Sequence, residues 1–191
     1  MAFDPIEGIA LLERHLARMK ASALAFGFAF DRHAARNELQ AATFRLREAK
    51  RIRLMLAKSG AVAIEVAAIP TPPEAPVAVT IAALPVAPDD FRLRHKTSDR
   101  AFYDKARQGF ETVFEIDGHI TEGSFTNVFV ERDGILLTPP LGAGLLPGVL
   151  RAELIESGRA AETPLTRADL ANGFFLGNAL RGLIPAKLIS A

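Results

Sequence analysis

The chain has 191 residues, 49% of them hydrophobic, which is enough for one core or for two small subdomains. Its formal net charge of +1 excludes a strong attraction to nucleic acid or to an anionic membrane, and the lack of cysteine excludes disulfides, thiolate zinc sites and cysteine nucleophiles. No apolar run reaches the roughly 18–20 residues that cross a bilayer. The start of the chain, with Asp4 and Glu7, is unlike a signal peptide, so we expect a cytoplasmic protein.

Two helices are predicted first along the chain. Residues 6–28 place Leu12, Leu16 and Met19 on one apolar stripe at helical spacing. A second helix is predicted over residues 31–50, with Asp31 as its amino-terminal cap.

The period of the apolar residues then changes to that of strands. Alternation and turn signals predict an antiparallel group of three strands, in residues 51–60, 61–69 and 76–84. The proline-rich residues 70–76 between the last two form a loop.

Residues 85–95 are predicted to connect two subdomains, 1–84 and 96–191. The second subdomain should begin with a helix entered through residues 97–99. Alternating strands follow, with tight turns at Asp117-Gly118 and Asp133-Gly134. Another helix is predicted to stop at Gly158, and the chain should close with a strand, a turn and a short tail.

Metal chemistry is not indicated by the histidines. None of the four has another at ligand spacing, and no H-E-x-x-H motif is present. We therefore expect no metal site; the four are His15, His33, His95 and His119.

Three other features complement one another. Lys96 is flanked by cationic residues, which lower the pKa of a lysine and favour an amine nucleophile. Glu122 lies at a half-buried strand edge, where a carboxylate needs a partner. Gly148 leads into a helix whose first amides, those of Val149 and Leu150, can bind a phosphate. Each also has an ordinary interpretation: a solvated basic patch, a turn residue and a capped helix.

Together these features supply an amine for a Schiff base, a carboxylate for a ring nitrogen and an anion site, which are the needs of pyridoxal phosphate. The chain also resembles the class IV aminotransferases and lyases, the fold-type IV pyridoxal-phosphate enzymes. Five ordered motifs carry this resemblance: "LLERHLARMKASA", "HKTSDRAFYDKAR", "ITEGSFTNVFV", "LLTPPLGAGLLPGVLR" and "FFLGNALRGLIP". The resemblance implies an α+β fold of two small α/β subdomains, like the D-amino-acid aminotransferases but shortened at the amino terminus.

The resemblance also implies roles for single residues. Lys96 matches the Schiff-base lysine, and Glu122 matches the carboxylate that faces the pyridine nitrogen. The positions matching phosphate contacts are those of Arg18, Val149, Leu150 and Asn178. Two weaker matches are Arg53, for a substrate carboxylate, and Tyr103, for the phenolic oxygen of the cofactor, although Tyr103 is two residues off the aminotransferase position.

Within the family, the "GNALRGL" segment is more similar to the aminodeoxychorismate lyases than to the branched-chain or D-amino-acid aminotransferases. The expected activity is therefore a lyase that forms 4-aminobenzoate and pyruvate for folate synthesis, with pyridoxal 5'-phosphate as cofactor. An aminotransferase and a catalytically silent relative that binds a partner, such as a synthase subunit, remain alternatives. A homodimer is also expected, because a partner chain could cover the edge left by the shortened amino terminus.

Overall fold

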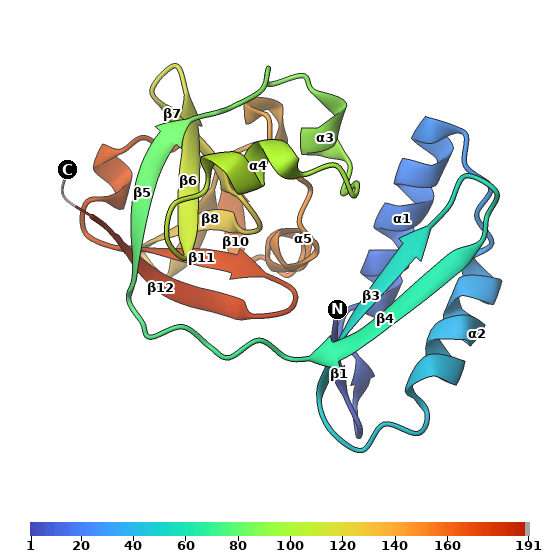
Figure 1. Cartoon of the computed structure of the whole chain (residues 1–191). Coiled ribbons are helices and arrows are strands. Elements are labelled where there is room, and N and C mark those ends of the chain that lie inside the picture. Colours follow the sequence, from blue (N-terminus) through green and yellow to red (C-terminus); the bar gives the residue numbers. More distant parts are fainter. Residues whose placement is uncertain (190–191) are drawn as a thin grey trace. The chain divides into compact units, whose positions relative to one another are not determined.

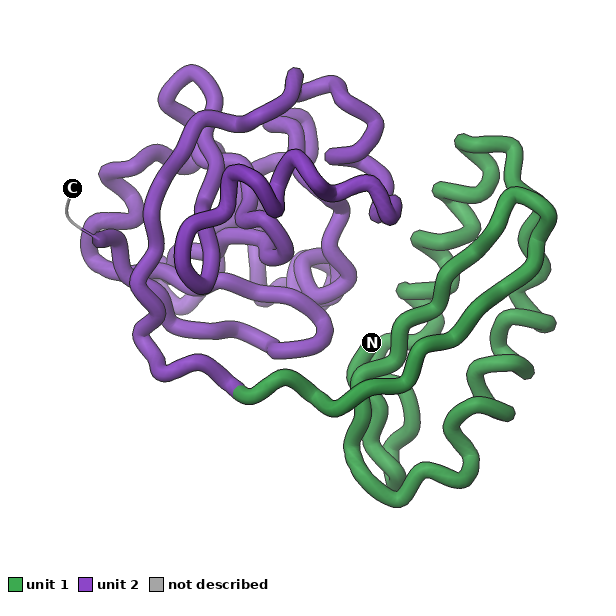
Figure 2. Tube along the Cα trace, in the orientation of Figure 1, with its two compact units in different colours: residues 1–71 green, residues 72–191 purple. Residues whose placement is uncertain are grey.

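The computed structural model describes residues 1–189 and divides the chain into two compact units, Met1–Thr71 and Pro72–Ala191 (Figures 1 and 2). Each unit has its own sheet and its own apolar core. Within residues 1–189, no helix combines the length and the apolar character needed to cross a membrane.

The Met1–Thr71 unit is a small antiparallel sheet with two helices packed on it. Its elements are β1 (Ala2–Asp4), β2 (Gly8–Ile9), α1 (Leu12–Phe26), α2 (Arg32–Thr43), β3 (Lys50–Leu56) and β4 (Val62–Ala68), and the strand order is β2-β1-β3-β4. Leu16 of α1, Leu39 of α2 and Ile52 of β3 are fully buried in one cluster. Both helices therefore cover the same face of the sheet.

The sequence predictions for this unit hold in outline. Asp31 caps α2 as predicted, because its carboxylate accepts from the amides of His33 and Ala34. Both helices are shorter than predicted. The first begins only at Leu12, because the residues before it form β1 and β2, and the second ends at Thr43, since Lys50 already pairs with Phe3 in the sheet.

The second unit is built on an eight-stranded sheet. Its strands are β5 (Val77–Ala83), β6 (Glu111–Ile116), β7 (His119–Gly123), β8 (Asn127–Arg132), β9 (Ile135–Thr138), β10 (Ala160–Glu162), β11 (Phe174–Asn178) and β12 (Gly182–Leu188). The strand order is β10-β9-β8-β11-β12-β5-β6-β7, and β7 also pairs with β8. This last pairing closes the strands from β8 to β7 into a ring around a core that includes Val79, Val113, Ile120, Val128 and Leu176.

Between residues 72 and 189 this unit has three helices: α3 (Phe91–Arg94), α4 (Ala101–Ala106) and α5 (Val149–Glu156). Short 3-10 turns occur at Leu141–Ala143 and Ala168–Leu170. The predicted hairpin turns are confirmed: Asp117 and Gly118 both have positive φ, as do Asp133 and Gly134, which is the backbone of a type I′ turn.

One strand prediction is wrong. The first two of the three strands predicted as a group do pair antiparallel, as β3 and β4, but β5 lies in the other sheet, parallel to both β12 and β6. The structure therefore divides the chain after Thr71, rather than after residue 84, and residues 85–95 lie inside the second unit. The physical reason is that the proline-rich loop releases β5 from its sequence neighbours, so its partners are distant in sequence.

Candidate active site

Glu122, on β7, is a buried acid of the second unit, with 2% of its surface exposed. Its Oε1 accepts a hydrogen bond from the Tyr103 hydroxyl at 2.6 Å, and its Oε2 accepts one from the Leu146 amide at 3.0 Å. Burial raises the pKa of Glu122 to about 7, although these two donors and the charges of Arg100 and Lys96 act to lower it. The site thus holds a carboxyl group that changes charge near neutral pH.

The Leu146 backbone is also held through its carbonyl group. Asn127, the first residue of β8 and the strand partner of Glu122, donates from Nδ2 to the Leu146 carbonyl oxygen at 3.1 Å. A Cβ on Gly148 would lie 1.8 Å from the Oδ1 of Asn127, so any other residue there would displace the Asn127 side chain. The segment from Leu146 to Gly148 is therefore packed tightly against the β7–β8 hairpin.

Helix α5 begins directly after this segment. Gly148 is its N-cap residue and provides no side-chain cap, so the first amides of the helix have no side-chain acceptor. Val149 is buried, and Leu150 packs towards Gly177 of β11, which fixes the direction of the helix. The Glu122 carboxylate and the start of α5 are thus joined through a single short segment.

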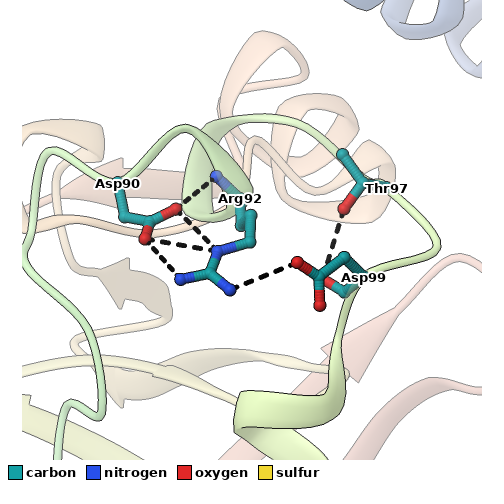
Figure 3. Close-up of polar contacts among 4 residues, drawn as sticks. All are labelled: Asp90, Arg92, Thr97 and Asp99. Carbon is teal, nitrogen blue, oxygen red and sulfur yellow. Dashed lines mark hydrogen bonds and ion pairs between the residues drawn. The ribbon is translucent and has the colours of Figure 1, made fainter.

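Lys96 lies on an extended segment between α3 and α4 and is exposed. Figure 3 shows how the two ends of this segment are tied together. Arg92 binds the Asp90 carboxylate through Nη2 at 2.7 Å and reaches Asp99 through Nη1 at 3.2 Å, while the Thr97 hydroxyl donates to the Asp99 carbonyl at 3.3 Å. Since Arg92 also stacks over the Phe102 ring at 4.7 Å, the segment that carries Lys96 is anchored to α4.

Tyr103 is 1% exposed and packs against Phe102 and Phe114 at ring distances of 4.2 and 4.9 Å. Its hydroxyl donates to the Glu122 carboxylate. The predicted place of Tyr103 near the phenolic oxygen of the cofactor stays a prediction. Burial beside the Glu122 carboxylate raises the pKa of Tyr103 far above its usual value, so its hydroxyl remains a donor.

Asn178 closes β11 and connects two turns. Its Oδ1 accepts from the amides of Leu180 and Arg181, both at 3.0 Å, and its Nδ2 donates to the Phe125 carbonyl oxygen at 3.3 Å. Asn178 therefore lies beside the turn that follows Glu122. Its predicted contact with a phosphate stays a prediction.

Arg18 and Arg53 belong to the Met1–Thr71 unit. Arg18 is half-buried on α1, and Arg53 lies on β3 with Nη1 3.8 Å from the Glu65 carboxylate. The structure describes each unit by itself, so their predicted contacts with phosphate and substrate stay predictions.

The sequence interpretation missed Asn127, Arg100 and Glu111. The signal for Asn127 was available, because a hairpin that reverses at residues 123–126 sets residue 127 opposite Glu122. Arg100 donates from Nη2 to the Ser124 carbonyl oxygen at 2.7 Å and lies over the Tyr103 ring at 4.8 Å, contacts that depend on the tertiary structure.

The donor set fits pyridoxal phosphate. A buried carboxylate suits a protonated pyridine nitrogen, and an uncapped helix terminus suits a phosphate. The Glu122 oxygens each hold one donor, so each keeps acceptor capacity for a further one.

Comparison with known proteins identifies the family. The family described as "Amino-transferase class IV" matches residues 6–189, so the chain belongs to the class IV aminotransferases, a family of pyridoxal-phosphate-dependent enzymes with the fold-type IV architecture. This confirms the resemblance seen in the five motifs.

Individual relatives carry two kinds of description. A protein of Schizosaccharomyces pombe described as "Putative aminodeoxychorismate lyase" is 30% identical over 94% of this chain and 84% of its own length. A solved structure from Mesorhizobium loti described as a "Putative amino-acid aminotransferase" is 40% identical, with a TM-score of 0.90 over 99% of this chain and 97% of its own. The 4-amino-4-deoxychorismate lyase of Pseudomonas aeruginosa, at 24% identity and a TM-score of 0.75, shares the fold.

A probable branched-chain-amino-acid aminotransferase of Thermotoga maritima is 30% identical, but the match spans only 39% of this chain and 30% of that protein. The solved fold relatives also include a protein described as "A hypothetical aminotransferase from Mycobacterium tuberculosis, PLP-bound form", 23% identical with a TM-score of 0.80.

Proposed function

We propose that the protein is a pyridoxal-phosphate-dependent lyase that converts 4-amino-4-deoxychorismate into 4-aminobenzoate and pyruvate. The observation that carries the cofactor part of the proposal is the bond from the Leu146 amide to the buried Glu122, which joins the acid to the start of α5. The choice of a lyase is supported by the similarity to the Schizosaccharomyces pombe protein over nearly the whole chain.

The proposed binding residues each meet a different part of the cofactor. Glu122 keeps a proton on the pyridine nitrogen, and the amides of Val149 and Leu150 bind the phosphate at the other end of the ring. Asn178 and, from the other unit, Arg18 are proposed as further phosphate contacts. Lys96 supplies the amine that holds the cofactor covalently through its aldehyde carbon.

The bound cofactor supplies an electron-withdrawing ring, which stabilises negative charge on the substrate carbon next to the amine. The Lys96 amine would remove the proton from that carbon. The carbon–oxygen bond to the enolpyruvyl group would break as the ring becomes aromatic, and the same lysine would return a proton to the enol carbon as pyruvate forms. One amine in two protonation states serves both transfers. Arg53 is proposed to bind a substrate carboxylate.

An aminotransferase is the second candidate function. It is supported by the Mesorhizobium loti structure, which has the higher identity and whose description names an amino-acid aminotransferase. Both reactions begin with the same proton removal, so Lys96 and Glu122 would keep their roles in either.

The two candidates differ in their products. The purified protein, loaded with pyridoxal phosphate, is incubated with 4-amino-4-deoxychorismate alone and then with amino donors plus 2-oxoglutarate. Pyruvate and 4-aminobenzoate without glutamate support the lyase, whereas glutamate from an amino donor overturns it in favour of the aminotransferase. Lys96→Ala is the control in both assays and should give neither product. If neither product forms with the parent chain and no visible cofactor absorbance appears, a silent partner-binding relative becomes the better proposal.

We also propose a homodimer, and a synthase subunit as a further partner. The edge strand β4, which pairs only with β3 among the described strands, is a surface where a second chain could add. Light scattering of the purified chain, alone and with the synthase, tests both associations.

A further inference from the structure

A second carboxylate, Glu111, is buried at the start of β6 with none of its surface exposed. Its Oε1 accepts from the Thr112 amide at 3.0 Å, the Ser124 amide at 2.8 Å and the Ser124 hydroxyl at 2.5 Å. Its Oε2 accepts from the Phe125 amide at 3.1 Å and the Thr126 hydroxyl at 2.9 Å. Four of these five donors belong to the turn between β7 and β8.

Burying the Glu111 carboxylate at this position costs desolvation free energy. Among the ion pairs found within residues 1–189, none includes it, so its burial is offset only by backbone amides and hydroxyl groups. An apolar side chain would fill the same volume without removing a carboxylate from water. The role of Glu111 is therefore to hold the groups that donate to it, most of which belong to the turn between β7 and β8.

Glu111 holds the turn of residues 123–126, which connects the two residues that bind Leu146. Glu122 directly precedes the turn and Asn127 directly follows it, and they clamp the amide and the carbonyl of Leu146. The turn is shaped around the carboxylate, because a Cβ on Gly123 would lie 2.7 Å from the Oε2 of Glu111.

We infer that Glu111 is a positioning residue: by ordering the turn of residues 123–126 it keeps Glu122 on the N–H of Leu146 and Asn127 on its carbonyl oxygen. Glu111 does not touch the reacting atoms of the proposed reaction and acts through Glu122. The inference deepens the proposed function, since the acid that it positions is the one assigned to the cofactor ring, but the contact itself exists in the protein without cofactor.

The test measures amide hydrogen exchange by NMR in the cofactor-free protein, comparing Glu111→Gln with the parent chain. The glutamine amide group places a donor against amides and hydroxyls that already donate, so the turn loosens. We expect the Leu146 amide to exchange about tenfold faster relative to the amides of β11. The matched control is Glu115→Gln, on the same strand, where the carboxylate forms a surface ion pair with Arg167; it should leave Leu146 exchange unchanged. Unchanged Leu146 protection in Glu111→Gln, with the sheet intact, overturns the inference.

A milder variant decides the matter if Glu111→Gln does not fold. Thr126→Val keeps the shape of the side chain and removes one of the five donors to Glu111. Leu146 exchange should rise by about threefold, while Thr43→Val, which loses a buried hydroxyl bonded to the Leu39 carbonyl in the other unit, should not change it. Equal Leu146 protection in both threonine variants contradicts the inference. Hydrogen exchange in the cofactor-free protein does not depend on turnover. A negative lyase assay therefore does not contradict the inference about Glu111, and unchanged Leu146 exchange does not contradict the proposed lyase activity.

Discussion

A carboxylate that is 2% exposed keeps its charge only if neighbouring groups replace the lost water. At Glu122 the replacement is incomplete: one hydroxyl and one amide donate to it, and burial remains the largest influence on its pKa. A cofactor with a protonated ring nitrogen would supply the missing cation. The acid is thus better suited to a bound positive group than to an empty site.

The first residue-scale prediction concerns turnover in Glu122→Gln. The substitution keeps the shape of the side chain but loses the charge that holds a proton on the ring nitrogen. We expect the visible cofactor absorbance to be retained and kcat to fall by about a hundredfold, or about 3 kcal/mol of transition-state stabilisation. Glu115→Gln, the surface control, should turn over at the parent rate. A Glu122→Gln enzyme as fast as the parent would mean that Glu122 serves only the fold.

A second prediction concerns how the stability of the cofactor-free protein depends on pH. Because the pKa of Glu122 is raised to about 7 in the fold, the folded state favours the protonated form. Its contribution to stability is fully present below the unfolded value of 4.5 and is lost as the pH rises through about 7. The free energy of unfolding of the parent, minus that of Glu122→Gln, should fall by up to about 3 kcal/mol over this interval.

Urea titrations followed by tyrosine fluorescence measure this difference, since Tyr103 is the only tyrosine and the chain has no tryptophan. The carboxylates whose pKa is lowered, such as Asp90 and Asp169, lose their contribution as the pH falls, but they are common to both proteins and cancel. A difference that stays constant from pH 4 to pH 8 would contradict the assigned environment of Glu122.

At the scale of elements, the entrance to α5 depends on the absence of a side chain at Gly148. The φ of Gly148 is −66°, which any residue adopts, so space and not backbone strain requires the glycine. Gly148→Ala should push the Asn127 amide away from the Leu146 carbonyl, because the added Cβ would lie 1.8 Å from Oδ1. We expect a loss of about 2 kcal/mol in stability and much weaker retention of pyridoxal phosphate.

Gly158→Ala is a useful comparison, since nothing lies within 4 Å of its added Cβ and only its positive φ of 72° opposes the change. It should lower the melting temperature without weakening cofactor retention in the protein that remains folded. Equal cofactor retention in both variants would show that the contact between Gly148 and Asn127 does not support the site.

Local signals predicted much of this structure. The Asp-Gly turns and the Asp31 cap depend on residues adjacent in sequence, and they were found where expected. The partners of β5 could not be predicted, because alternation of apolar residues sets the face of a strand but not its neighbours. The same limit applies to the site: Lys96 and Glu122 stood out by residue type, whereas the bond from Tyr103 to Glu122 spans 19 residues and required the fold.

At the scale of the whole molecule, the position of β5 predicts where the chain can be cut. A fragment of residues 72–191 keeps β5 between β12 and β6 and should unfold cooperatively, with buried Tyr103. A fragment of residues 85–191 lacks β5 and should show no cooperative transition, because the ring of strands is opened at its centre. Circular dichroism melting compares the two. Cooperative melting of the shorter fragment would restore the boundary predicted from sequence.

The doubly held Leu146 backbone has a consequence for the size of molecule that can be accommodated. The N–H and the C=O of Leu146 belong to the two planar peptide groups on either side of its Cα, so hydrogen bonds to both restrict rotation about the backbone bonds of this residue. The three residues from Leu146 to Gly148 therefore fix the distance between the Glu122 carboxylate and the first amides of α5. In the proposed site the ring nitrogen of the cofactor meets Glu122 and its phosphate meets the start of α5, so adding or deleting a single residue here would change the distance between these two contacts, even with every binding side chain retained.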